Sequence, residues 1–322
     1  MGALTLAVTG ATGYLGRAVV AEARVRGHSV HALLRDARQA PDAWVRDPGI
    51  ALQEGSLERL TPAALKRVDA VLHLAAAMAG NDATQERETL TPMRAVLVAM
   101  AGCDPPPRLV LASSISVHGG MLVGDTVTET TQLEDEPQRR DAYARAKLAQ
   151  EALARAHAAA TGAAVAILRI GAIWGPGRLW NGHLGFGLGP VLIRMGSGGQ
   201  IPLAHLDRAA SMVLHAAEVP LQGVQIANVL DADLPDRARY VAALRRGGWP
   251  RLVLPLGWPV MRALSLLEAV PGMPGLLRAP VQRARIMPLT YASRAMWLCD
   301  PPAHSFEQAM SAALSAEGKS HG

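Results

Sequence analysis

The stretch "AVTGATGYLG" (Ala7–Gly16) constrains the fold most, because its three glycines separate a short apolar run from a helical one. Glycine at position 10 allows a positive φ, at 13 it lets the backbone approach a ligand, and at 16 it lets a helix pack closely on a strand. Such a turn presents N–H groups and the positive end of a helix dipole. It therefore predicts a pyrophosphate site, although GxxGxxG differs from the GxGxxG spacing and a purely structural turn is the alternative.

Short β-rich runs alternate with longer helical runs through the first half of the chain. The expected strands are Leu4–Thr9, His28–Arg35, Asp69–Ala75, Arg108–Ser114 and Ala164–Ile170. Nearly continuous apolar strands with helices between them indicate a parallel sheet that is covered on both faces. The prediction is an α/β fold: a doubly wound parallel sheet of the Rossmann type over residues 1–175, and a smaller, mainly substrate-binding C-terminal region over 176–322. Segments 207–218 and 224–230 are expected to return to the Rossmann core.

Composition excludes several classes of protein. The chain has 322 residues, of which 50% are hydrophobic, enough for a sizeable core. Cys103 and Cys299 are isolated, so neither a disulfide framework nor a metal site has support. The formal charge of +5 comes from scattered arginines, and no nucleic-acid partner is expected. No secretion signal is recognisable at the N-terminus, so we expect a cytoplasmic protein.

The apolar segment Leu252–Leu277 is the least ordinary part of the chain. Four prolines, Arg262 and Glu268 interrupt it, so it lacks the roughly 20 uninterrupted apolar residues of a membrane span. Core or interface packing is the favoured interpretation, and contact with a membrane surface is the lesser alternative.

The helix expected over Asp141–Gly162 carries Tyr143 and Lys147 on one face, because they stand four residues apart. A nearby cation lowers the pKa of a phenol from about 10. Ser114 ends a predicted strand, at the sheet edge where doubly wound proteins bind ligands. Ser114, Tyr143 and Lys147 therefore predict acid/base chemistry beside a dinucleotide. For the Tyr/Lys pair alone, a solvated helix face is the alternative.

Five stretches together resemble the extended short-chain dehydrogenase/reductase family, which includes nucleotide-sugar epimerases and dehydratases. They are "TGATGYLG" (9–16), "LHLAA" (72–76), "SSISVHG" (113–119), "YARAK" (143–147) and "LRIGAIWGPG" (168–177), with a fainter match in "AHLDRAA" (204–210). The resemblance implies that Tyr143 is the acid/base, and that Lys147 lowers its pKa and binds the nicotinamide ribose. It also implies that Ser114, Ser116 and Tyr143 contact the substrate.

The resemblance implies a nicotinamide dinucleotide cofactor. The implied contacts are Gly10, Thr12, Gly13, Tyr14, Leu15, Gly16, Arg35, Ser56, Leu57, Leu74, Ala75, Ala76, Tyr143, Lys147, Ile170 and Ile173. Residues 12–15 would bind pyrophosphate, 74–76 would line the adenosine side, and 170–173 would flank the nicotinamide. Arg35 ends the second strand, and its guanidinium suits a 2′-phosphate, so NADP is preferred over NAD. The adjacent Asp36 would suit a free ribose hydroxyl, which leaves NAD as the alternative.

Four positions depart from the family pattern. Ser56 replaces an Asp that meets adenine, Thr89 replaces an Asn on the helix before the serine strand, and His118 replaces a Tyr and is expected to pack. Ala172 stands where sugar-nucleotide members carry an Asn, and an alanine cannot hydrogen-bond a sugar or diphosphate.

Ala172 thus removes a support for a sugar nucleotide, and the apolar, glycine-rich later region suits a hydrophobic molecule. The favoured interpretation is an NAD(P)-dependent oxidoreductase that interconverts a carbonyl and an alcohol on a small or medium hydrophobic substrate. An NAD-dependent epimerase or dehydratase acting on a sugar nucleotide is one alternative. A non-catalytic dinucleotide-binding sensor is the other. The resemblance also suggests a homodimer, because relatives often dimerise through helices that include the one carrying the Tyr/Lys pair.

Overall fold

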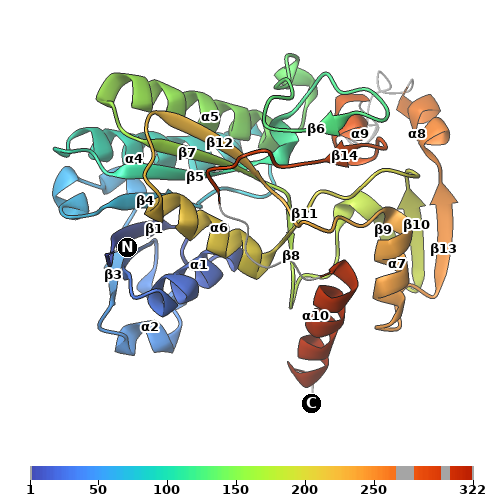
Figure 1. Cartoon of the computed structure of the whole chain (residues 1–322), viewed down its shortest axis with the longest axis horizontal. Coiled ribbons are helices and arrows are strands. Elements are labelled where there is room, and N and C mark those ends of the chain that lie inside the picture. The colour runs from blue at the N-terminus through green and yellow to red at the C-terminus, as the bar shows by residue number, and fades with distance from the viewer. Residues whose placement is uncertain (1, 266–278, 299–304, 321–322) are drawn as a thin grey trace.

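A seven-stranded parallel sheet forms one side of the molecule in this computed structural model, which describes residues 2–265, 279–298 and 305–320 (Figure 1). Its strands are β1 (Thr5–Thr9), β2 (Ser29–Leu34), β3 (Ile50–Glu54), β4 (Ala70–His73), β5 (Arg108–Ser114), β7 (Val165–Ile170) and β12 (Val224–Val229). The order is β12-β7-β5-β4-β1-β2-β3. The chain therefore switches direction between β1 and β4, where doubly wound sheets bind ligands. The predicted fold class is confirmed.

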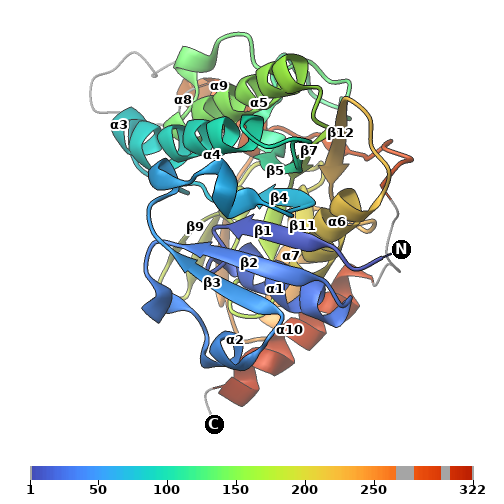
Figure 2. The ribbon, with the colours of Figure 1, turned by 90° about the vertical axis from the view of Figure 1, so that its left-hand side faces the viewer.

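Helices cover both faces of this sheet, as Figure 2 shows. One face carries α1 (Tyr14–Val25), α2 (Asp42–Arg46) and α6 (Leu206–Glu218), and the other carries α3 (Asp82–Gln85), α4 (Thr91–Ala101) and α5 (Ala142–Thr161). Successive strand residues point to opposite faces, so Leu6 and Val8 join the core under α1 and α6, whereas Ala7 joins the core under α4 and α5. All three side chains are fully buried.

Helix α5 has clear signals at both ends. The Asp141 carboxylate accepts a hydrogen bond from the Ala144 N–H at 2.8 Å, which caps the first turn. Gly162 ends the helix in the left-handed region at φ +72°. The helix predicted over 141–162 is therefore confirmed, with Tyr143 and Lys147 in its first two turns.

The last strand of the sheet comes from beyond residue 175. β12 pairs with β7 from Val224 opposite Val165 to Val229 opposite Ile170, and α6 packs on the sheet before it. The two segments expected to return to the Rossmann core do so. The division of the chain at residue 175 stays a prediction.

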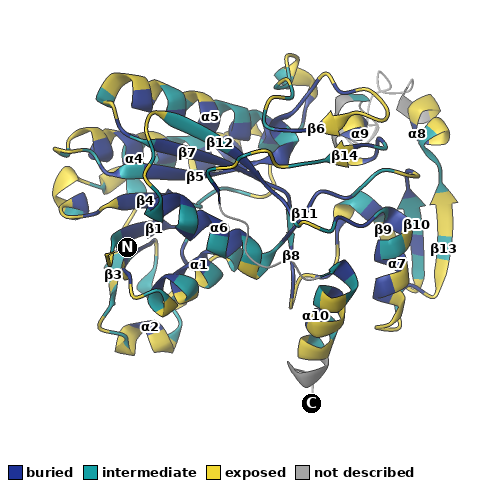
Figure 3. Ribbon diagram, viewed as in Figure 1, coloured by how far each residue is buried: buried dark blue, intermediate teal, exposed yellow. Residues whose placement is uncertain are grey.

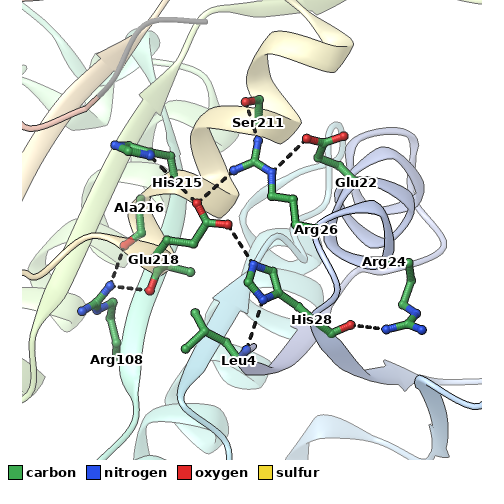
Figure 4. Close-up of polar contacts among 11 residues, drawn as sticks. Leu4, Glu22, Arg24, Arg26, His28, Arg108, Ser211, His215, Ala216 and Glu218 are labelled. Carbon is green, nitrogen blue, oxygen red and sulfur yellow. Dashed lines mark hydrogen bonds and ion pairs between the residues drawn. The ribbon is translucent and has the colours of Figure 1, made fainter. Parts of the chain in front are cut away.

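Figure 4 shows how α6 is joined to the α1–β2 turn. Glu218 accepts from Arg26 at 3.0 Å and contacts His28 Nε2 at 2.8 Å. Arg26 also donates to Ser211 and Glu22, and His28 Nδ1 accepts from the Leu4 N–H. These contacts connect residues almost 200 positions apart, at the sheet edge opposite the glycine turn.

A smaller region lies beside the carboxyl edge of the sheet (Figure 3). Its strand pairs are β8 (Ala172–Trp174) with β11 (Leu203–His205), β6 (Thr126–Val127) with β14 (Thr290–Tyr291), and the three-stranded sheet of β9 (Gly185–Leu188), β10 (Val191–Met195) and β13 (Leu252–Leu256). Its helices are α7 (Arg237–Arg245), α8 (Trp258–Ser265), α9 (Ala279–Arg285) and α10 (Phe306–Ser320). Trp174, Tyr240 and Phe306 form the centre of its core.

Short helical turns complete the connections: η1 (Ala37–Gln39), η2 (Leu57–Arg59), η3 (Pro62–Leu65), η5 (Ile115–Val117), η6 (Pro137–Arg139), η7 (Gly182–Leu184) and the π-helical η4 (Glu86–Leu90). The apolar segment 252–277 forms β13 and α8 up to residue 265, and its remainder lies outside the described residues. Among the helices in the described part of the chain, none is both long and apolar enough to cross a bilayer.

Candidate active site

The glycine turn joins β1 to α1 beside the end of β4. Gly10 has φ +67°, and a Cβ there would lie 2.9 Å from the Ala75 backbone nitrogen. A Cβ on Gly16 would lie only 2.1 Å from the Gly10 carbonyl oxygen. Both positions therefore require glycine, one for its backbone angle and one for the close packing of α1 on β1.

The N-terminus of α1 is suited to an anion. Gly13 is the N-cap, and among the described residues no side chain caps this end and no acidic residue lies in the first turn. A Cβ on the exposed Gly13 would project from this turn, where it would meet only the Gly10 carbonyl oxygen, at 3.1 Å. The N–H groups of Tyr14, Leu15 and Gly16 can donate hydrogen bonds to a pyrophosphate, and the helix dipole favours its negative charge. Thr12 lies in the same turn, and its carbonyl oxygen accepts from Arg17.

Thr9 ties the end of β4 to this turn. Its hydroxyl oxygen accepts from the Leu74 and Ala75 N–H groups at 3.2 and 3.3 Å and contacts His73 Nδ1 at 3.1 Å. Burial, with Lys147 adding to it, lowers the pKa of His73 to about 3, so this imidazole is neutral at physiological pH. Ala76 follows directly. Residues 74–76 are thus held beside the glycine turn.

The adenosine side is more open. Arg35 follows β2 and is exposed. The Asp36 carboxylate accepts from Arg38 at 2.9 Å, and this hydrogen bond lowers the Asp36 pKa. Ser56 caps η2 by accepting from the Glu58 N–H at 3.4 Å, and Leu57 packs against the core under α4.

Two serine hydroxyls meet where β5 ends. The hydroxyl oxygen of Ser114 accepts from both the backbone nitrogen and the hydroxyl of Ser116, at 3.2 and 3.0 Å. Ser114 pairs in register with the buried Ile170 of β7. Ile173 lies just beyond, in β8, partly buried against the core under α1.

Tyr143 lies beside Ser114. Burial raises the pKa of the phenol, and the nearby Ser114 hydroxyl opposes that rise. The pKa of Tyr143 is therefore not lowered as expected from Lys147, because desolvation of the phenol is the larger effect.

Lys147 is almost fully buried at 4% exposure. Its ammonium donates to the Ala112 carbonyl oxygen at 2.7 Å and to Gln150 Oε1 at 2.9 Å. Burial lowers the pKa of Lys147 to about 8, against the opposing charge of Glu151. The lysine is therefore still mostly charged at neutral pH and loses its charge about one pH unit higher.

Two arginines at the site escaped the sequence reasoning. Arg285, at the end of α9, pairs with Asp141 at 2.9 Å, and Arg178 lies over the Tyr14 ring at 5.5 Å. Both cations lower the pKa of Tyr143, whereas Asp141 raises it. Arg178 therefore contacts the glycine turn and influences the phenol at once. Only the fold brings these arginines to Tyr143, and no local motif marks them.

A buried ion pair supports the serine strand from behind. Glu151, one helical turn after Lys147, accepts two hydrogen bonds from Arg169 at 2.9 Å and one from the Ser113 hydroxyl at 2.7 Å. Arg169 and Glu151 are 2% and 1% exposed. This two-point pairing fixes α5 relative to β5 and β7, and thereby positions the phenol.

The departures from the family pattern have structural roles. Thr89 accepts from the Ala77 N–H and donates to Gln85, both at 2.9 Å, so it holds the chain that leaves β4. His118 contacts the Thr131 carbonyl oxygen through Nδ1 at 3.1 Å, and burial lowers its pKa to about 4. Ala172, in β8, offers no side-chain hydrogen bond.

Comparison with known proteins agrees with this arrangement. Residues 6–225 match the model of the "NAD dependent epimerase/dehydratase family". A curated relative, the dTDP-6-deoxy-L-talose 4-dehydrogenase (NAD(P)(+)) of Kitasatospora kifunensis, is 32% identical over 184 residues, which is 56% of each chain. The chain therefore matches just over half the length of that relative.

Solved structures share the fold along the whole chain. MoeE5 in complex with UDP-glucose and NAD has a TM-score of 0.73 at 20% identity, covering 99% of this chain and all of that one. The UDP-glucuronic acid 4-epimerase of Bacillus cereus in complex with NAD has a TM-score of 0.74 at 15% identity, with the same coverage. Because the family model matches most of the length of this chain, the chain belongs to the NAD-dependent epimerase/dehydratase family.

Proposed function

We propose that this chain is an NAD(P)-dependent enzyme that interconverts a secondary alcohol and a ketone on a nucleotide-linked sugar. The observation that carries the proposal is the placement of Arg178, which lies over Tyr14 of the glycine turn and lowers the pKa of Tyr143. The anion-binding turn and the phenol are thereby parts of one site. Ser114 contributes a hydroxyl to the same site.

The side chains divide the chemistry among them. Bound nicotinamide supplies or accepts the hydride. Tyr143 donates a proton to the substrate oxygen during reduction and removes one during oxidation, with the Ser114 hydroxyl close to the phenol. Lys147 lies behind the phenol and, in its charged form, stabilises the phenolate that remains after proton donation.

Charge at the site favours an anionic substrate over the hydrophobic one expected from the sequence. Arg178 and Arg285 both act on Tyr143, and a nucleoside diphosphate presents the oxygens that guanidinium groups bind in pairs. The relatives' names also refer to dTDP and UDP sugars. These observations support the sugar-nucleotide alternative better than the hydrophobic carbonyl.

For the cofactor we retain NADP over NAD. Asp36, the residue that would bind a free ribose hydroxyl, is hydrogen-bonded by Arg38, while Arg35 is exposed beside it. A 2′-phosphate would meet two guanidinium groups there. The NAD in the solved structures is bound by those proteins, and it does not decide the preference of this chain.

Turnover tests the proposal. The purified chain is incubated with NADP or NAD and a panel of dTDP- and UDP-hexoses, and products are separated by mass and by sugar stereochemistry. We expect a keto sugar with net cofactor reduction, and a Tyr143→Phe variant slowed by about 10²- to 10⁴-fold at unchanged cofactor affinity. Epimerised sugar without net reduction would favour the epimerase. Equal turnover by the phenylalanine variant would remove the catalytic assignment.

A further inference from the structure

Gln150 lies on the same face of α5 as Tyr143 and Lys147. Positions i, i+4 and i+7 recur on one side of a helix, and these three residues occupy such positions. Gln150 is fully buried, and its side-chain oxygen accepts a hydrogen bond from the Lys147 ammonium at 2.9 Å. The glutamine therefore follows the lysine in the row that begins with the phenol.

The amide group of Gln150 is hydrogen-bonded through its oxygen and not through its nitrogen. Within the described residues, the buried Nε2 atom has no hydrogen-bond partner. A buried N–H group without an acceptor costs folding free energy, and an apolar side chain of similar size would avoid that cost. Packing therefore does not explain a glutamine at this position, whereas the hydrogen bond to Lys147 requires its oxygen.

Two acceptors hold the Lys147 ammonium. A lysine ammonium has three N–H groups, of which one donates to the Ala112 carbonyl oxygen on β5 at 2.7 Å and another donates to Gln150. Over the described ranges, no other side-chain oxygen accepts from this ammonium. The two hydrogen bonds fix the nitrogen between α5 and β5, at 5.7 Å from the centroid of the Tyr143 ring.

The charged groups around Lys147 do not take over this hydrogen bond. Glu151, the next residue on α5, accepts from Arg169 on β7 with both oxygens at 2.9 Å. His73 on β4 is neutral at physiological pH, because burial lowers its pKa to about 3. The remaining ionisable side chains on α5 near the lysine, and those on the helices and turns packed against it, form ion pairs: Asp82 with Arg145, Glu86 with Arg94, Arg87 with Glu88, Arg139 with Glu136, and Arg155 with Glu151.

We propose that Gln150 is the positioning residue for Lys147: its side-chain oxygen, together with the Ala112 carbonyl, holds the ammonium at the Tyr143 ring and leaves one N–H for the ribose of a bound dinucleotide. A neutral acceptor favours the charged lysine, and it does so without a carboxylate that would draw the ammonium away from the ring. The catalytic consequence rests on the proposed function, in which charged Lys147 stabilises the phenolate.

The titration of Lys147 tests this inference without any substrate. The chain has only three lysines, Lys66, Lys147 and Lys319, so protein labelled at the lysine ε-carbon gives an NMR spectrum that is simple to assign. The signal that is lost in Lys147→Arg belongs to Lys147. Gln150→Met keeps the length of the side chain and removes the acceptor, so the Lys147 titration should move down by about one pH unit. Gln150→Glu keeps an acceptor and adds a negative charge, so the titration should move up.

An unchanged Lys147 titration in either folded variant overturns the proposal. Thermal unfolding verifies that the variants are folded, and if Gln150→Met does not fold, Gln150→Glu alone decides. His157→Met is the matched control, because His157 is 6% exposed and lies farther along the same helix. An equal change of the titration in the control would assign the effect to a loosened α5 and would contradict the proposal.

Turnover provides the second measurement. If Gln150 acts through the charge of Lys147, Gln150→Met should lower kcat/KM for ketone reduction about fivefold at pH 8 and less than about twofold at pH 6.5. An equal loss at both pH values would indicate a merely structural role. A chain that turns over no sugar nucleotide would contradict the proposed function, whereas the NMR titration would still decide the role of Gln150.

Discussion

The ammonium nitrogen of Lys147 lies 5.7 Å from the centroid of the Tyr143 ring. It approaches the π face of the ring, and its hydrogen bonds go to Ala112 and Gln150 rather than to the phenol oxygen. We therefore expect the lysine to act on Tyr143 through its charge across the ring rather than through a direct hydrogen bond. Its own pKa of about 8 makes that action dependent on pH.

The first prediction concerns the alkaline limb of the rate profile. Below about pH 8 Lys147 is charged, and above it the cation is lost, whereas burial keeps the Tyr143 phenol protonated beyond its usual pKa. We expect kcat/KM for ketone reduction to fall above a pKa of about 8. Lys147→Arg, whose guanidinium stays charged, should move that limb to higher pH. A profile that is the same in both proteins would contradict this role.

The Ser114 hydroxyl should matter through the phenol. Because the Ser114 hydroxyl opposes the rise in the Tyr143 pKa, Ser114→Ala should raise that pKa further and lower kcat/KM by roughly tenfold. Ser116→Ala is the matched variant, because it removes the neighbouring hydroxyl, which donates a hydrogen bond to Ser114. Steady-state kinetics on both variants provides the measurement. Equal losses would mean that the two hydroxyls act as one unit.

Arg35 should discriminate between the cofactors. Arg35→Ser removes a guanidinium that a 2′-phosphate would engage, so NADPH affinity should fall about tenfold and NADH affinity should not change. Arg46→Ser, at an exposed site on α2, should affect neither. Titration of tryptophan fluorescence with each nucleotide measures both constants. Unchanged NADPH binding would shift the preference toward NAD.

The glycine turn separates stability from binding. A Cβ on Gly16 meets the Gly10 carbonyl oxygen at 2.1 Å, so Gly16→Ala forces the backbone apart and should cost about 1–3 kcal/mol of unfolding free energy. A Cβ on Gly13 meets the same oxygen at the longer distance of 3.1 Å. Gly13→Ala should therefore lose less stability than Gly16→Ala and should lose dinucleotide affinity, as urea unfolding and nucleotide titration would establish. Equal stability loss in both variants would refute the distinction.

Local patterns were sufficient for the parts of the fold that depend on neighbouring residues. Strand Arg108–Ser114 was predicted with its observed bounds, and α5 begins and ends at its Asp and Gly caps. The edge strand β3 ends in the polar residues Gln53 and Glu54, and it was not among the strands predicted from residue patterns. Propensity is weakest where a strand is only half covered.

The electrostatics of the site could not be obtained in the same way. Proximity of Tyr143 to Lys147 was readable from their spacing, but the extent of burial was not, and burial determines the direction of the Tyr143 pKa. Arg285 reaches Asp141 across 144 positions. The small sheet likewise pairs β10 with β13, two strands that are separated by more than 50 residues in the sequence.

Glu218 provides a test of the contacts that hold α6 in place. Its carboxylate contacts both His28 and Arg26, and the Glu218 side chain is 11% exposed (Figure 4). Glu22 pairs with the same arginine, but the Glu22 side chain is 36% exposed. Glu218→Gln removes the charge of the carboxylate that Arg26 and His28 share, leaves Arg26 with Glu22 as its remaining charge partner, and should cost about 2 kcal/mol of unfolding free energy. Glu22→Gln should cost less than about 1 kcal/mol, because exposed ion pairs contribute little. Urea unfolding of the two variants compares them directly, and cofactor affinity in the folded protein should be unchanged because both residues lie opposite the glycine turn. Equal costs would mean that α6 is held by its apolar packing on α1, and that the Glu218 contacts are incidental to stability.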